Sequence, residues 1–145
     1  PTVIFMVGDH QPNISDEFLN AVCGKKWKKW GSKKMMKRYA VPFIIWANYD
    51  IEEQTVEKTS MNFLQTILTE ATGGEMTGYQ KFLQDFREEV PVITSMGYWG
   101  KDGKFYNISD KDSPYYEKVH EYSILQYNNL MDSKHRISGF FELEK

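Results

Sequence analysis

The chain has 145 residues, of which 41% are hydrophobic and 15% are aromatic, so it has about one domain's worth of residues and is too apolar for a disordered segment. Its formal net charge of −2 predicts no global attraction to nucleic acid. No apolar run reaches about 18 residues, so we expect no membrane-spanning segment in the chain itself. The single cysteine, Cys23, excludes an internal disulfide.

Two continuously apolar runs predict strands, at residues 2–7 and 41–47. Runs without polar alternation are typical of strands buried on both faces, so both are expected to be buried. Residues 8–13 predict a loop at the end of the first strand. Pro42 falls near the start of the second strand, where a missing N–H is tolerated.

The segment between these strands predicts irregular helical structure. Asn13 or Ser15 could cap a short helix that ends near Cys23. Residues 24–38 contain two glycines and predict a loop or an irregular helix.

The second half of the chain predicts three helices. The first has Ser60 as its N-cap and ends at Gly73, and the second starts at Thr77 and ends before Pro91. A third should start at Ser113-Pro114 and run to about Met131. Its inner face is expected to comprise Tyr116, Val119, Tyr127, Leu130 and Met131.

The remaining elements are predicted to be short strands. An Asp102-Gly103 turn flanked by aromatic residues predicts a hairpin within residues 92–106. Packing of this aromatic hairpin on the core is favoured over a carbohydrate-binding platform. Residues 137–143 predict a last strand, and His120 is expected at the boundary of the helical core.

These elements predict an α/β fold with a partial sheet flanked by helices, a C-terminal hairpin and a long helix. Two buried strands and a late hairpin are few for an independent doubly wound domain. We therefore expect residues 1–145 to be the C-terminal part of a single catalytic domain whose N-terminal part is absent.

A basic segment carries 8 of the 18 basic residues between Gly24 and Arg38, with no acidic residue among them. The simpler interpretation is a solvated loop whose Trp27 and Trp30 pack on the domain. The alternative is an anionic surface or polymer as partner, because tryptophans among lysines suit a membrane interface.

Asp9 and His10 are the candidate metal ligands, directly after an apolar strand and Gly8. A carboxylate and an imidazole suit Zn²⁺, Mn²⁺ or Mg²⁺ near a phosphate. A zinc site needs about three or four protein ligands, so two residues make at most half a site. A purely structural loop, with Asp9 accepting backbone hydrogen bonds, remains the alternative.

The motif at residues 5–12, Phe-Met-Val-Gly-Asp-His-Gln-Pro, resembles the late metal-binding motif of the alkaline phosphatase/sulfatase superfamily. In particular it resembles the lipoteichoic acid synthase-like phosphoglycerol transferases of bacteria. Four further stretches resemble that family in order and spacing, at residues 39–50, 60–64, 90–98 and 122–130.

This resemblance implies that Asp9 and His10 bind one divalent cation, Mn²⁺ in this family, with Mg²⁺ and Zn²⁺ as alternatives. It implies a threonine nucleophile and an acidic ligand in the N-terminal part. The enzyme would move phosphoglycerol from a phosphatidylglycerol-type lipid to a cell-surface glycolipid or polymer through a threonine-linked intermediate. The parent would be anchored in the bacterial cell membrane, with an extracellular catalytic domain and an anionic phospholipid or glycolipid substrate.

No residue of this chain matches the nucleophile or the phosphate-binding residues of that family, so the chain alone is expected to be inactive. Two alternatives stay open. One is a sulfatase or phosphoethanolamine transferase of the same superfamily, and the other is a non-catalytic module that binds anionic polymers through residues 25–38.

Overall fold

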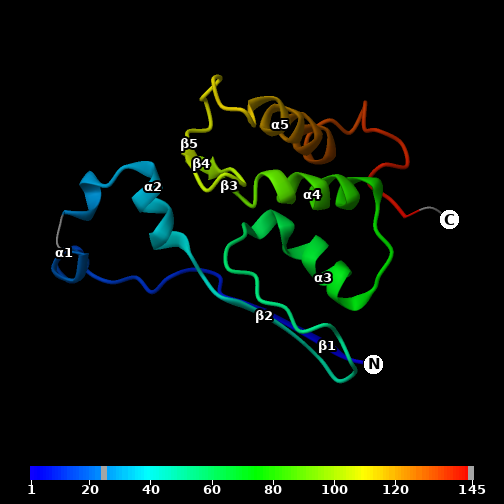
Figure 1. Ribbon diagram of the computed structural model, residues 1–145, viewed down its shortest axis with the longest axis horizontal. Helices are drawn as coiled ribbons and strands as arrows, with labels where there is room; N and C mark the ends of the chain where they lie inside the picture. Colours follow the sequence, from blue (N-terminus) through cyan, green and yellow to red (C-terminus); the bar gives the residue numbers. More distant parts are fainter. Residues whose placement is uncertain (24–25, 144–145) are drawn as a thin grey trace. The chain divides into compact units, whose positions relative to one another are not determined.

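The computed structural model describes residues 1–23 and 26–143 (Figure 1). The chain divides into two compact units, Pro1–Tyr49 and Asp50–Lys145. Each unit is described by itself below.

The first unit contains an antiparallel ribbon in which β1 (Val3–Val7) pairs with β2 (Phe43–Ala47). The register runs from Val3 opposite Ala47 to Val7 opposite Phe43. Backbone hydrogen bonds extend the ladder at both ends, from Asn48 N–H to the Thr2 carbonyl at 3.1 Å and from Gly8 N–H to the Pro42 carbonyl at 3.0 Å. Both predicted strands are confirmed in position, and their direct antiparallel pairing brings Gly8 beside the start of β2.

The expectation that these strands are buried is wrong, because one face is exposed and the other is mostly half-buried. Side chains alternate across a strand, and the outward set Ile4, Met6, Ile44 and Trp46 is 46–56% exposed. On the other face Phe5 and Phe43 make an edge-to-face contact at 6.3 Å between centroids. A continuous apolar run indicates that both faces of a strand are suited to burial. Burial of both faces also needs covering layers, which a two-stranded ribbon does not supply by itself.

A helical lobe joins the two strands, at one end of the ribbon (Figure 1). It comprises α1 (Asp16–Cys23), a 3₁₀ turn η1 (Trp27–Lys29), α2 (Ser32–Met35) and a 3₁₀ turn η2 (Met36–Tyr39). The Ser15 hydroxyl accepts a hydrogen bond from Phe18 N–H at 3.3 Å, so Ser15 caps α1. The predicted irregular helix is confirmed for the described part of the basic segment; residues 24–25 lie outside the described residues.

The second unit starts with two helices in sequence. A 3₁₀ turn η3 (Met61–Phe63) leads into α3 (Leu64–Thr72), which ends at Gly73 with a φ of +67°. The next helix, α4 (Gly78–Glu89), begins with a capping box between Thr77 and Gln80. The predicted cap at Ser60 is wrong in its chemistry, because the Ser60 hydroxyl accepts from Ile93 N–H at 2.9 Å and so ties the chain to β3.

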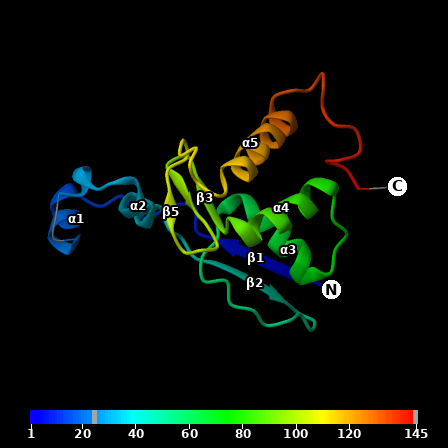
Figure 2. The ribbon, with the colours of Figure 1, turned by 45° about the horizontal axis from the view of Figure 1, so that its top comes forward.

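Helix α4 lies between α3 and α5 (Tyr116–Leu130) and supplies the centre of the core (Figures 1 and 2). Phe86 stacks on Tyr122 of α5 at 4.9 Å and lies 5.9 Å from the ring of Phe63. The buried apolar side chains of this unit include Phe63, Leu64, Ile67, Leu83, Phe86, Val90, Tyr98, Tyr115, Val119 and Tyr122.

A three-stranded antiparallel meander, β3 (Val92–Thr94), β4 (Gly97–Trp99) and β5 (Phe105–Tyr106), replaces the single predicted hairpin. The Asp102-Gly103 turn joins β4 to β5, with Gly103 at a φ of +73° as the turn chemistry requires. The expected α/β class is confirmed, with the meander and the long helix α5 near the C-terminus.

The predicted inner face of α5 is wrong at its C-terminal half. Val119 is buried as predicted, whereas Tyr127, Leu130 and Met131 are 61–72% exposed. Tyr122, which the prediction omitted, is buried because it stacks on Phe86 of α4. The predicted strand at residues 137–143 is a turn region. There the Phe140 carbonyl accepts from Tyr79 N–H at 2.8 Å, and both Phe140 and Phe141 contact the Tyr79 ring.

The packing of the meander on α5 predicts that Gly100→Ala destabilises the second unit by about 1–3 kcal/mol. Gly100 is buried, and a Cβ there would lie 2.2 Å from Cε2 of Tyr115. Chemical denaturation of the two single variants, Gly100→Ala and Tyr115→Ala, and of the double variant measures the coupling. Most of the loss in unfolding free energy caused by Gly100→Ala should disappear when Tyr115 is already alanine. Losses that simply add in the double variant would show that Gly100 and Tyr115 do not clash in this way.

Candidate metal centre

The candidate ligands Asp9 and His10 lie at the end of β1 that faces the start of β2. The strand ends at Val7, and Gly8 N–H still bonds to the Pro42 carbonyl. The Gln11 side-chain amide donates to the Ala40 carbonyl, so the loop after the pair is also tied to the segment before β2. These contacts fix the Asp-His loop from both sides while leaving its side chains in solvent.

Gly8 matters for space and not for an unusual backbone conformation, because it is not among the glycines with positive φ. A Cβ at this position would come within 3.0 Å of the Val41 Cβ. Glycine therefore lets the two backbone segments approach closely beside the pair.

Hydrogen bonds orient both side chains of the pair. One carboxylate oxygen of Asp9, Oδ1, accepts from His10 N–H at 2.8 Å, which leaves Oδ2 available. The His10 Nδ1 lies 3.1 Å from the Gln11 carbonyl oxygen. Because a carbonyl only accepts, we assign the Nδ1 proton to this bond, which leaves a lone pair on Nε2 in the neutral ring.

The two remaining ligand atoms lie close together, with Asp9 Oδ2 3.3 Å from His10 Nε2. Metal–ligand distances of about 2.1 Å would place two atoms at this separation on one ion with an angle of about 100° between them. The distance alone is therefore compatible with two positions of one divalent cation.

Among residues 1–23 and 26–143, no group of three or more His, Cys, Asp and Glu side chains could hold a metal ion. The other two histidines belong to the second unit. His120 is an exposed residue that stacks on Tyr116 at 6.0 Å, rather than the boundary residue that we expected, and His135 pairs with Asp132 at 3.0 Å. In the described part of the chain, Asp9 and His10 are therefore not joined by a third candidate ligand.

The tryptophans of the basic segment pack within the first unit, as the simpler interpretation predicted. Trp27 Nε1–H donates to Asp16 at 2.7 Å, and Arg38 stacks over the Trp27 ring at 4.7 Å. Lys28 also pairs with Asp16 at 2.6 Å, and this bond, followed by that of Trp27, lowers the pKa of the Asp16 carboxyl. Sequence reasoning missed Asp16, although it is one of only two acidic residues near the basic segment.

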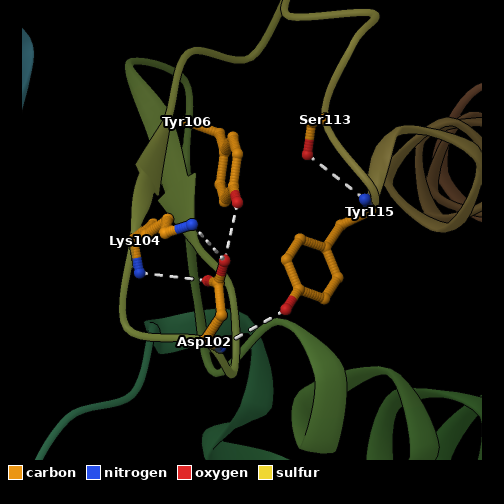
Figure 3. Close-up of polar contacts among 5 residues, drawn as sticks. All are labelled: Asp102, Lys104, Tyr106, Ser113 and Tyr115. Carbon is orange, nitrogen blue, oxygen red and sulfur yellow. Dashed lines mark hydrogen bonds and ion pairs between the residues drawn. The ribbon is translucent and has the colours of Figure 1, made fainter.

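The aromatic residues of the meander pack on the core, which confirms the favoured interpretation over a carbohydrate platform. Tyr98 is fully buried and stacks on Tyr106 at 5.6 Å. Figure 3 shows the polar contacts of the β4–β5 turn. The Tyr106 hydroxyl donates to the Asp102 carboxylate at 2.7 Å, and Asp102 N–H donates to the Tyr115 hydroxyl at 3.3 Å. These bonds join the β4–β5 turn to the start of α5.

No protein-family model, curated protein or solved structure matches this chain. The family resemblance therefore rests on the motifs themselves. In the described ranges, none of the helices combines the length and the apolar character needed to cross a bilayer.

The Asp102–Tyr106 hydrogen bond predicts an unusual titration. It raises the pKa of Tyr106 from 10.0 to about 12, while the same bond lowers the pKa of Asp102 from 3.8. Between the ordinary carboxyl range and pH 10 the bond should stabilise the turn fully. This stabilisation should be lost as the pH rises towards 12, where Tyr106 ionises, and also in acid, where Asp102 is protonated. NMR titration of ring-labelled tyrosine, with Tyr106→Phe for assignment, measures the shift. Asp102→Asn should return the Tyr106 pKa towards 10, and an unchanged value would contradict the assignment.

Proposed function

We propose that this chain is the C-terminal part of the catalytic domain of a metal-dependent phosphoglycerol transferase of the lipoteichoic acid synthase-like family. The observation that carries the proposal is that Asp9 Oδ2 and His10 Nε2 lie 3.3 Å apart at a strand end. The motif around this pair is the part of the chain that most resembles the family.

Asp9 and His10 would hold the cation, Mn²⁺ by analogy with the family, through one oxygen and one nitrogen. A divalent cation at such a site polarises a phosphoryl oxygen and favours a deprotonated hydroxyl nucleophile. The Nδ1–H bond to the Gln11 carbonyl would keep the imidazole in the tautomer and orientation that binding requires. The Gly8 N–H bond to Pro42 and the Gln11 side-chain bond to Ala40 would keep the loop rigid beside the reacting phosphate.

The exposed apolar face of the ribbon supports a place in a larger sheet. Ile4 lies opposite Trp46, and Met6 lies opposite Ile44, so the apolar side chains form two cross-strand pairs on one surface. Such a surface suits coverage by other elements of a catalytic domain. The nucleophile and the further ligands would come from that part of the protein.

The substrate assignment rests on the resemblance. A sulfatase or phosphoethanolamine transferase would use the same kind of Asp-His pair, so the pair does not separate these activities. The stretches at residues 39–50, which include β2, and 122–130, in α5, favour the phosphoglycerol branch. An anionic phospholipid donor and a cell-surface glycolipid or polymer acceptor are the substrates that this branch implies.

The proposal predicts weak but specific Mn²⁺ binding by the purified chain. Asp9→Ala and His10→Ala should each weaken binding at least about tenfold, because each removes one of two ligands. Electron paramagnetic resonance of free Mn²⁺ measures the bound fraction. The matched control is His135→Ala, which removes a histidine of similar exposure that is also paired with an aspartate. Equal losses in the control, or no loss in Asp9→Ala, would contradict the proposed site.

The chain alone should show no phosphodiesterase turnover, because the nucleophile is expected in another part of the domain. Turnover by the purified chain that Asp9→Ala abolishes would show that the nucleophile lies within these residues.

A further inference from the structure

The helical lobe, defined as residues 14–39, has an unusual combination of charge and exposure. It holds eight basic and two acidic residues, a net charge of +6, whereas the rest of the chain has 10 basic and 18 acidic residues. Among its described residues, Leu19 is the only fully buried side chain. Most of the surface of the lobe is therefore available for binding.

Helix α1 directs two apolar side chains into solvent. Phe18 is 58% and Val22 is 69% exposed, and their i,i+4 spacing places them on one face. This face is opposite to that of Asp16 and Asn20, which hold Trp27 by hydrogen bonds at 2.7 and 2.9 Å. The helix thus uses one side to organise the basic segment and leaves the other side apolar and uncovered.

The lysines of the lobe that the structure describes are exposed, whereas its two tryptophans are half-buried. Lys33, Lys34 and Lys37 lie on one face of the α2–η2 turn, since their spacing is i, i+1 and i+4. Lys34 reaches back over the Trp30 ring at 4.3 Å, and Trp30 is only partly accessible. The tryptophans therefore stabilise the lobe, and the contact with a partner falls to the lysines and the exposed apolar residues.

We propose that the helical lobe docks on an anionic lipid surface, with its lysines at the headgroups and Phe18 and Val22 inserted between them. Charge complementarity favours an anionic partner, and each lysine near such a surface strengthens binding about fivefold. A soluble polyanion would use the lysines alone, and the exposed Phe18 and Val22 would have no role. A lipid interface uses both. The docking does not depend on metal binding by Asp9 and His10.

The test is co-sedimentation of the whole chain with phosphatidylcholine vesicles that contain or lack phosphatidylglycerol. We expect binding only with phosphatidylglycerol, and release by salt. Neutralising Lys26, Lys29 and Lys37 to Gln should weaken binding at least tenfold, because their ammonium groups make no ion pair among the described residues. The charge-matched control neutralises the exposed Lys81, Lys111 and Lys134 of the second unit, and it should bind like the unaltered chain.

A second variant tests the apolar contact separately. Phe18→Gln, at an exposed position, should keep the circular dichroism spectrum and still weaken vesicle binding severalfold, while Asp9→Ala should leave binding unchanged. Equal losses in both lysine variants would overturn the proposal. Binding of soluble polyphosphate as strong as that of the vesicles would also overturn it, if Phe18→Gln weakens the two kinds of binding equally. Salt-sensitive self-association without vesicle binding would assign the lobe to a second copy of this chain and would also overturn it.

Discussion

The antiparallel pairing of β1 with β2 is the constraint on which the candidate site depends. Because the strands run in opposite directions, the end of β1 meets the start of β2, and Gly8 lies against Val41 and Pro42. The helical lobe must then connect the strands at that same end. The pairing of the two strands therefore places both the Asp-His pair and the helical lobe at the same end of the ribbon.

The pair itself owes its form to short-range hydrogen bonds. The Asp9 carboxylate accepts from the next residue's N–H, and the His10 ring donates to the Gln11 carbonyl. Each bond occupies one atom of a side chain and leaves the other atom without a hydrogen bond to the neighbouring residue. The two free atoms lie 3.3 Å apart, although side chains on a regular strand would point apart.

Local signals predicted most elements, and packing decided the exceptions. The helix start at Thr77, the Gly73 stop and the Asp102-Gly103 turn depend on a few neighbouring residues, so their sequence patterns were sufficient. The inner face of α5 was predicted correctly at Val119 but missed Tyr122, because periodicity finds an apolar stripe but not which of its residues a partner covers. Ser60 was likewise misassigned, since its hydroxyl bonds to Ile93, which is 33 residues away.

The sequence by itself determined that Asp9 and His10 follow an apolar strand and that the positive charge gathers in one segment. Both facts are properties of neighbouring residues. Only the tertiary structure decided that Oδ2 and Nε2 lie 3.3 Å apart, that Gly8 lies tightly against Val41, and that Asp16 anchors Trp27. It also decided which apolar side chains are covered, because burial depends on what a strand or helix packs against and not on its own hydrophobicity.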